Sequence, residues 1–252
     1  MIVNIISSII LGIIQGITEF LPVSSSGHLV IAQTLIPGFR QPGVLFDVVL
    51  HLGTTLAVII FYYKRIIEIL KSNWNYIWLL VIGTIPAGLA GVLFSKQLEA
   101  MFSDVKAIAI QFLITGVICI LIDRYNGIKD KITTKNSFLI GVAQAIAIIP
   151  AISRSGLTIF TGSVLGIDKK KVAEFSFLMS IPAILGANAL EFVKHGVNME
   201  GEIANYIVGF IAAFIFGYLS IKVVLSTLHE KQFKYFGVYC LILAIVTFIF
   251  VG

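Results

Sequence analysis

The chain has few charged residues: Asp, Glu, Lys and Arg make up only 12% of its 252 residues. That share is about half of what soluble domains carry, and no polar stretch is long enough to build a separate soluble domain. Hydrophobic residues account for 58% of the chain, and the mean hydropathy is +1.01. The composition therefore predicts a single membrane domain over residues 1–252, an all-α protein that crosses the bilayer several times.

Cysteine is equally scarce. Cys119 and Cys240 each lie inside an apolar run, which excludes a disulfide framework and favours a role in packing. The first twenty residues lack a basic start and a small-residue cleavage site, and they contain Glu19, so no cleavable signal is expected there. The net charge of +5 follows the membrane topology described below, and no nucleic-acid partner is expected.

Six apolar runs are long enough to cross a bilayer, at residues 44–63, 77–94, 107–122, 175–193, 203–225 and 235–251. Segments 2–36 and 138–166 differ, because each has an apolar arm, a polar island and a second arm of about nine residues. At about 1.5 Å per residue such an arm reaches only the middle of the membrane. We therefore predict six transmembrane helices plus two re-entrant helical hairpins.

The basic residues predict the orientation. Of the 18 Lys and Arg residues, thirteen fall on one side of this topology and four on the other, with Arg154 inside the second hairpin. Because positive loops face the cytoplasm, both termini are expected outside the cell membrane.

An internal duplication accompanies this topology. At an offset of 129 residues, six polar or small residues of the first half fall on identical residues of the second: Ser8, Gly12, Gln15, Ser24, Ser26 and Gly27 on Ser137, Gly141, Gln144, Ser153, Ser155 and Gly156. Repeat 1 covers approximately 1–128 and repeat 2 approximately 129–252. Each holds one hairpin and three crossings, an odd number, so the second copy is inverted and the two hairpins meet near the midplane.

The polar islands are Pro22-Val-Ser-Ser-Ser-Gly-His28 and Pro150-Ala-Ile-Ser-Arg-Ser-Gly156. A charge at the bilayer centre costs roughly 3 kcal/mol, so the charged groups here are expected to be paired or exposed to water. Arg154 with Ser153 and Ser155 has the chemistry of a phosphate cradle. The helix that follows adds an N-terminus and Thr158 to this cradle. Ser24 and Ser26 repeat the arrangement from the other hairpin.

Gln15 and Glu19 are four residues apart and share one helical face, where their oxygens could hold a divalent cation such as Mg²⁺ or Ca²⁺. A helix–helix hydrogen bond is the alternative for Gln15, and a structural ion pair the alternative for Glu19. His28 could serve as nucleophile or general acid/base, and Ser25 could be a nucleophile activated by His28. His51 was assigned a packing role in preference to a place in the cavity.

These motifs resemble those of the undecaprenyl-diphosphate phosphatase family, also known for bacitracin resistance. The stretch from Gln15 to His28 is similar to its (Glu/Gln)xxxGlu-plus-Ser/His motif, and Pro150 to Thr158 to its Pro-Gly-x-Ser-Arg-Ser-Gly-x-Thr motif. Ala151 departs from the usual glycine. Gln15 stands where Glu is common, which weakens its case as a carboxylate ligand.

The resemblance implies hydrolysis of the C55 isoprenoid diphosphate in carrier-lipid recycling for the cell wall, with dependence on a divalent cation. It implies that Glu19, with Gln15, helps to bind the cation or positions water, and that Arg154, Ser153, Ser155 and Thr158 bind the diphosphate. His28 or Ser25 would attack or shuttle protons, direct attack by water is left open, and the catalytic set is Glu19, His28, Ser25 and Arg154. The expected partners are this lipid and the surrounding membrane, and a homodimer is left open. The rival hypothesis is a flippase for an isoprenoid phosphate, because transporters also place broken helices at the midplane.

Overall fold

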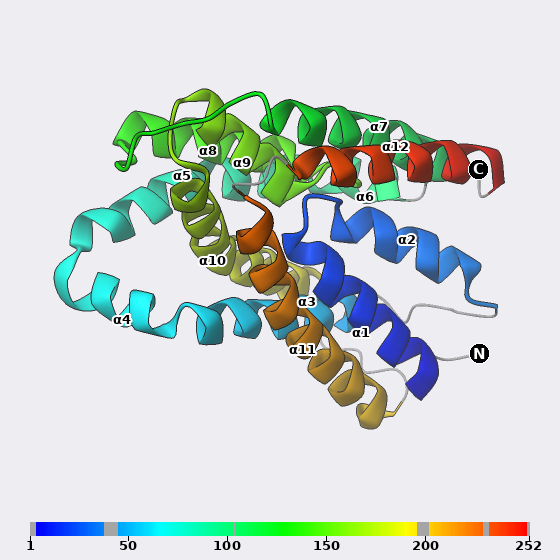
Figure 1. The fold of residues 1–252 in the computed structure, drawn as a ribbon. Helices are drawn as coiled ribbons and strands as arrows, with labels where there is room; N and C mark the ends of the chain where they lie inside the picture. Colours follow the sequence, from blue (N-terminus) through cyan, green and yellow to red (C-terminus); the bar gives the residue numbers. More distant parts are fainter. Residues whose placement is uncertain (1–3, 38–44, 103, 196–201, 229–231, 251–252) are drawn as a thin grey trace.

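The computed structural model describes residues 4–37, 45–102, 104–195, 202–228 and 232–250 (Figure 1). The first residues of the hairpin predicted at 2–36, the first of the span at 44–63 and the last of the span at 235–251 lie outside these ranges. The helices are α1 (Ile5–Phe20), α2 (Ser25–Leu35), α3 (Leu45–Phe61), α4 (Tyr63–Ser72), α5 (Trp74–Leu93), α6 (Ser95–Phe102), α7 (Val105–Ile122), α8 (Thr134–Ile146), α9 (Arg154–Val164), α10 (Lys169–His195), α11 (Ile203–Thr227) and α12 (Phe233–Phe250).

Five helices in the described part are long and apolar enough to cross a membrane: α5, α7, α10, α11 and α12. Helices α3 and α4 together make a sixth candidate span, bent by 70° at the break between Phe61 and Tyr63. The prediction of an all-α membrane protein is therefore confirmed, with five or six candidate spans.

Two helix starts were predicted at least three residues too late, because hydropathy marks only the apolar part of a helix and capping decides where it begins. Helix α5 starts at Trp74, where the Asn73 side chain accepts a hydrogen bond from the Tyr76 amide at 3.2 Å. Helix α10 starts at Lys169, where Asp168 accepts from the amides of Lys170 and Lys171. Such side-chain acceptors satisfy amides that lack an intrahelical partner.

Each polar island joins two short helices. Helices α1 and α2 are connected through Pro22, and α8 and α9 through Pro150. Proline disfavours a continuous helix, but α5 and α10 continue through Pro86 and Pro182, so proline alone does not end a helix in this chain. Ser24 and Ala151 have positive φ angles of 69° and 55°, which reverse the chain at these turns. The second arms, α2 and α9, are eleven residues long each, so both are too short to span a bilayer.

Close helix packing depends on glycine. Helix α1 packs along α11, α11 also packs on α3, α5 packs on α8 and α10, and α7 packs on α12. A Cβ atom added at Gly12 would collide with the Gly209 carbonyl and with the Ala212 side chain, and one at Gly16 with the backbone of Gly217. Small residues at helix contacts are the usual way in which membrane helices approach closely.

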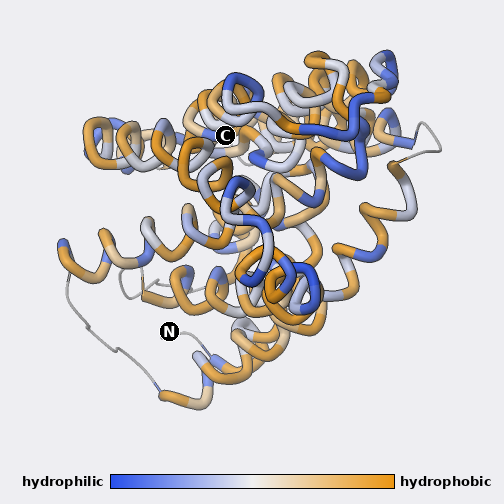
Figure 2. The backbone as a smooth tube through the Cα atoms, turned by 90° about the vertical axis from the view of Figure 1, so that its left-hand side faces the viewer, coloured by the Kyte–Doolittle hydropathy of each residue, from blue (hydrophilic) through white to orange (hydrophobic). Residues whose placement is uncertain are grey.

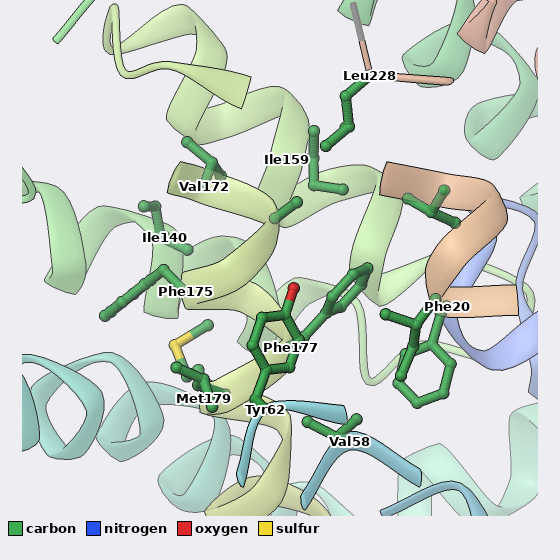
Figure 3. Packing of buried hydrophobic residues seen from close by; sticks show 14 of the residues in the cluster. Phe20, Val58, Tyr62, Ile140, Ile159, Val172, Phe175, Phe177, Met179 and Leu228 are labelled. Carbon is green, nitrogen blue, oxygen red and sulfur yellow. The ribbon is translucent and has the colours of Figure 1, made fainter. Parts of the chain in front are cut away.

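The largest buried cluster surrounds the first half of α10 (Figure 3). Phe175, Phe177 and Met179 are fully buried there, and the Phe177 ring meets Phe20 of α1 edge-on at 5.3 Å between ring centroids. Val58 of α3 and Tyr62, the residue directly after α3, belong to the same cluster. The first hairpin is thereby packed against the helix that follows the second.

The two ends of the fold lie on one side. The start of α1 and the end of α12 are both at the right of Figure 1, and α4 is at the left. Figure 2, viewed onto the left-hand side of Figure 1, shows hydrophilic segments among helices that are mostly hydrophobic. Large apolar side chains such as Leu89, Ile215 and Ile245 are exposed, as expected for surfaces that face lipid.

The Gly12→Ala variant tests the α1–α11 contact. Overpacking of this kind costs about 1–3 kcal/mol, and the purified protein should lose roughly 3–10 °C of its melting temperature. The Gly88→Ala variant is the matched control, because a Cβ at Gly88 meets nothing within 4 Å. Equal melting temperatures for the two variants, measured by thermal unfolding in detergent, would contradict the described packing.

Candidate functional site

The two island loops have the same local construction. The Ser24 hydroxyl accepts from the Gly27 amide at 3.5 Å and lies 3.3 Å from the Ser26 hydroxyl. The Ser153 hydroxyl accepts from the Gly156 amide at 3.1 Å and lies 3.2 Å from the Ser155 hydroxyl. Each serine thus caps the helix that follows it, so two helix N-termini begin at the two loops.

Backbone strain accompanies both loops. A positive φ costs a non-glycine residue about 1–2 kcal/mol, and Ser24 and Ala151 both bear this cost. Such residues persist where the surrounding structure holds them, most often at functional sites. The strain at Ala151 gives a physical reason for glycine at this position, where the motif discussed above usually has one.

Glu19 lies between the two loops and is the centre of the site. Its carboxylate, 5% exposed, accepts from Arg154 Nη2 at 2.9 Å through Oε1. Oε2 accepts from the Ser25 hydroxyl at 2.7 Å and from Gln15 Nε2 at 3.0 Å. Ser25 and Arg154 occupy corresponding positions of the two halves, 129 residues apart. The structure therefore brings the guanidinium and the carboxylate together from different hairpins.

Arg154 is held from a second side. Its Nη1 atom donates to the Ser176 carbonyl of α10 at 3.3 Å, and the side chain is 15% exposed. The attraction between the buried carboxylate and guanidinium offsets the free-energy cost of removing each charge from water. Removal of one partner would leave an unpaired buried charge and destabilise the fold by about 3–5 kcal/mol.

His28 faces away from Glu19. Its Nδ1 atom donates to the Ser24 carbonyl at 2.6 Å, so Nε2 accepts from the Tyr239 hydroxyl of α12 at 2.8 Å. The ring also stacks on Tyr239 and meets Phe112 edge-on. The Ser25 hydroxyl is thus bound to Glu19, whereas both nitrogens of His28 are bound to other groups, the Ser24 carbonyl and the Tyr239 hydroxyl.

Ser155 and Thr158 form hydrogen bonds that hold the second loop and its helix in place. The Ser155 hydroxyl donates to the Leu21 carbonyl at 3.1 Å, which links the second loop to the first. The Thr158 hydroxyl lies 2.7 Å from that of Ser176 on α10 and donates to carbonyls of its own helix. Thr158 is fully buried on the α10 side of α9.

Helix α7 forms hydrogen bonds with the backbone of both loops. The Thr115 hydroxyl donates to the Ala151 carbonyl at 2.7 Å and accepts from the Ser153 amide at 3.0 Å. The Cys119 thiol donates to the Pro22 carbonyl at 2.9 Å. Thr115 could not be recognised from the sequence, because a lone threonine in an apolar span is common.

Two further groups beside this site come from α3: His51, for which a place in the cavity was the less favoured alternative, and Thr54, for which no role was predicted. His51 Nε2 lies 3.9 Å from Glu19 Oε2, and Thr54 Oγ1 lies 3.5 Å from Gln15 Nε2. The assignment of His51 to packing is therefore wrong, since its ring faces the carboxylate. The available signal was a polar His51-x-x-Thr54 pair on one face of an otherwise apolar helix.

One polar atom beside Glu19 is unsatisfied: Gln15 Oε1 is buried without a hydrogen-bond partner. No group of three or more His, Cys, Asp or Glu side chains suited to a metal occurs in the described part of the chain. The Gln15 amide faces Glu19 with its nitrogen, and a half-turn of the amide would give the two oxygen donors that hard divalent cations prefer.

A helical membrane protein with a buried carboxylate–guanidinium pair between two hydroxyl-rich loops has the construction of an integral membrane enzyme for an anionic ligand. Residues 8–246 match the family model described as bacitracin resistance protein BacA. The undecaprenyl-diphosphatase of Carboxydothermus hydrogenoformans is 42% identical over 250 residues, which are 96% of this chain and 95% of that protein. The undecaprenyl-diphosphatases of Methanosphaera stadtmanae and Christiangramia forsetii are 34% and 38% identical, and each alignment covers 98% of both chains. The chain belongs to the bacitracin resistance protein BacA family.

The Thr115→Val variant tests the contact between α7 and the second loop. Valine keeps the shape but leaves the Ala151 carbonyl and the Ser153 amide unpaired, which costs about 1–3 kcal/mol. Thermal unfolding should show the loss. Thr84→Val is the control, because the Thr84 hydroxyl donates only to the Leu80 carbonyl of its own helix. A Thr115→Val protein as stable as this control would contradict the described role.

Proposed function

We propose that the protein is an integral membrane undecaprenyl-diphosphatase, which hydrolyses undecaprenyl diphosphate to undecaprenyl phosphate and inorganic phosphate and so recycles a cell-wall carrier lipid. The observation that carries this proposal is the convergence of Ser25 and Arg154 on the two oxygens of Glu19. A nucleophile, a base and an anion clamp are thereby assembled in one place. The full-length similarity to undecaprenyl-diphosphatases supports the same function.

Substrate binding is assigned to the second loop and its helix. The Arg154 guanidinium would exchange part of its contact with Glu19 for two oxygens of the diphosphate, because a planar fork matches such an anion. The hydroxyls of Ser153 and Ser155, with Ser24 and Ser26 of the first loop, would donate further hydrogen bonds. Thr158 would act indirectly, by holding α9 against α10.

The nucleophile is assigned to Ser25. Its hydroxyl already donates to Glu19 Oε2, which is the geometry of a nucleophile with its general base. The oxygen would attack the terminal phosphorus as its proton passes to Glu19, and the bond from that phosphorus to the lipid monophosphate oxygen breaks. Water then cleaves the phosphoserine to inorganic phosphate and restores Ser25. His28 can act as an acid only when Nε2 is protonated and has exchanged Tyr239 for substrate.

A divalent cation is proposed at Gln15 and Glu19. Gln15 Nε2 faces the carboxylate in the structure, and a half-turn of the amide would bring the unpaired Oε1 to the position where it could bind such an ion. When bound, it would offset the negative charge that develops on the phosphoryl oxygens.

The finer architecture proposed is an inverted repeat with two re-entrant hairpins. Helices α1, α3, α5 and α7 correspond, at an offset of 129 residues, to α8, α10, α11 and α12. The packing repeats accordingly: α1 on α11 is matched by α8 on α5, and α11 on α3 by α5 on α10. This pairing supports a pseudo-twofold relation between the halves. A homodimer stays a prediction.

We expect detergent-purified protein to release phosphate from farnesyl or undecaprenyl diphosphate in a chelator-sensitive reaction. Glu19→Ala and Arg154→Ala should each lower turnover by about 10²–10³-fold or more, because each removes a charge that acts on the reacting group. The matched control is Lys135→Ala, an exposed charge removed on α8. Phosphate release that survives in Glu19→Ala, together with loss of lipid translocation in sealed vesicles, would replace this proposal with the flippase.

Orientation is proposed with both termini outside, on the basis of the positive residues around α4 and the start of α10. A cysteine in place of Lys170 should react with a membrane-impermeant maleimide only after the cells are permeabilised. A cysteine in place of Lys106, at the other end of the spans, should react in intact cells. The reverse pattern would refute this orientation. The native Cys119 and Cys240 are buried and should give little background.

A further inference from the structure

His51 of α3 has an orientation that packing does not explain. Its Nδ1 atom donates to the Asp47 carbonyl at 2.8 Å, so in the neutral ring Nε2 carries a free lone pair. Nε2 lies 3.9 Å from Glu19 Oε2, and the side chain is 26% exposed. A histidine whose second nitrogen is fixed by a backbone carbonyl has the arrangement that metal ligands of this type commonly show.

The gap between the two atoms is too long for a hydrogen bond and close to the spacing of two ligands of one cation. At 3.9 Å the two atoms are too far apart for a hydrogen bond, whose heavy-atom distance is about 2.7–3.2 Å. Bonds from Zn²⁺ to imidazole nitrogen and carboxylate oxygen are about 2.0–2.2 Å each, and two such ligands at a tetrahedral angle lie about 3.4 Å apart. A shift of about 0.5 Å would therefore let these two atoms hold one such ion.

Gln15 supplies a third donor. Its Nε2 lies 3.0 Å from the same Glu19 Oε2, and its Oε1 is buried and unpaired. Rotation of the amide by half a turn exchanges these atoms and brings Oε1 toward the carboxylate. Two oxygens in that position repel each other unless a cation lies between them. The donors of α1 and α3 would then surround one position.

We infer that His51 is the third protein ligand, with Glu19 and Gln15, of the divalent cation included in the proposed function, on which this inference rests. A nitrogen donor favours transition ions over Mg²⁺ and Ca²⁺, which prefer oxygen. Mn²⁺ binds most weakly of these transition ions, and it serves as the probe because it is paramagnetic. Because Arg154 already neutralises Glu19 through Oε1, the ion adds two uncompensated charges. A diphosphate would supply the balancing charge and further ligands, so the ion and the diphosphate bind together.

Mn²⁺ with methylenediphosphonate, a non-hydrolysable diphosphate, is the probe for this site. In the detergent-purified protein, pulsed electron paramagnetic resonance should detect coupling of bound Mn²⁺ to one imidazole nitrogen. The coupling should disappear in His51→Gln and His51→Asn and persist in His28→Gln, the control for the other histidine near the loops. Mn²⁺ affinity should fall by on the order of 10-fold or more in both His51 variants.

The wild-type spectrum decides the inference even if a variant fails to fold. Absence of Mn²⁺ binding, Mn²⁺ without nitrogen coupling in the wild type, or coupling that persists in a folded His51 variant overturns it. Phosphate release from farnesyl diphosphate by the same preparations separates the two proposals. Release without nitrogen coupling rejects His51 as a ligand and keeps the enzyme, whereas nitrogen-bound Mn²⁺ without release rejects the proposed function and keeps the site.

Discussion

The pairing of Glu19 with Arg154 is the constraint on which the rest of the structure depends. A carboxylate that is 5% exposed needs a countercharge, because neither packed side chains nor lipid can solvate it. The partner comes from a segment 135 residues further along the chain, so the pair can form only when two separate hairpins end at the same place. The broken helices, the strained turns and the hydrogen bonds from α7 to the loops all help to place Glu19 beside Arg154. A continuous helix at either position would leave a charge unpaired.

Packing makes this meeting possible. Gly12 and Gly16 let α1 approach α11 closely. The Phe20–Phe177 contact packs the end of α1 against α10, so Glu19 lies at the centre of the bundle. Thr115 and Cys119 on α7 then bind carbonyls of the two loops. The polar backbone of the loops is thereby satisfied by protein, as is required for irregular segments in a membrane domain. These contacts offset the cost of placing serine-rich loops inside an apolar helix bundle.

Much of this could be predicted from the sequence, though not evenly. The spans and the broken hairpins follow from hydropathy and from the proline-serine islands, since both depend on composition that is local in the chain. The convergence of Glu19 and Arg154 followed from the repeat. The positions of His28 and His51 could not be predicted, because the direction of a side chain depends on which helix packs beside it. The Tyr239 hydroxyl of α12 forms a hydrogen bond with His28 Nε2. His51 lies near Glu19 because α3 packs next to α1.

Hydrophobicity and spacing by themselves determined that this chain is a helical membrane protein with two polar loops, because burial in lipid imposes a pattern on every residue of a span. They also determined which charges would have to be compensated. Only the tertiary structure decided which atoms compensate them: Ser25 and Gln15 on one carboxylate oxygen, Arg154 on the other, and Thr158 directed to Ser176. These contacts join distant segments, and their geometry is set by helix packing that no local pattern encodes.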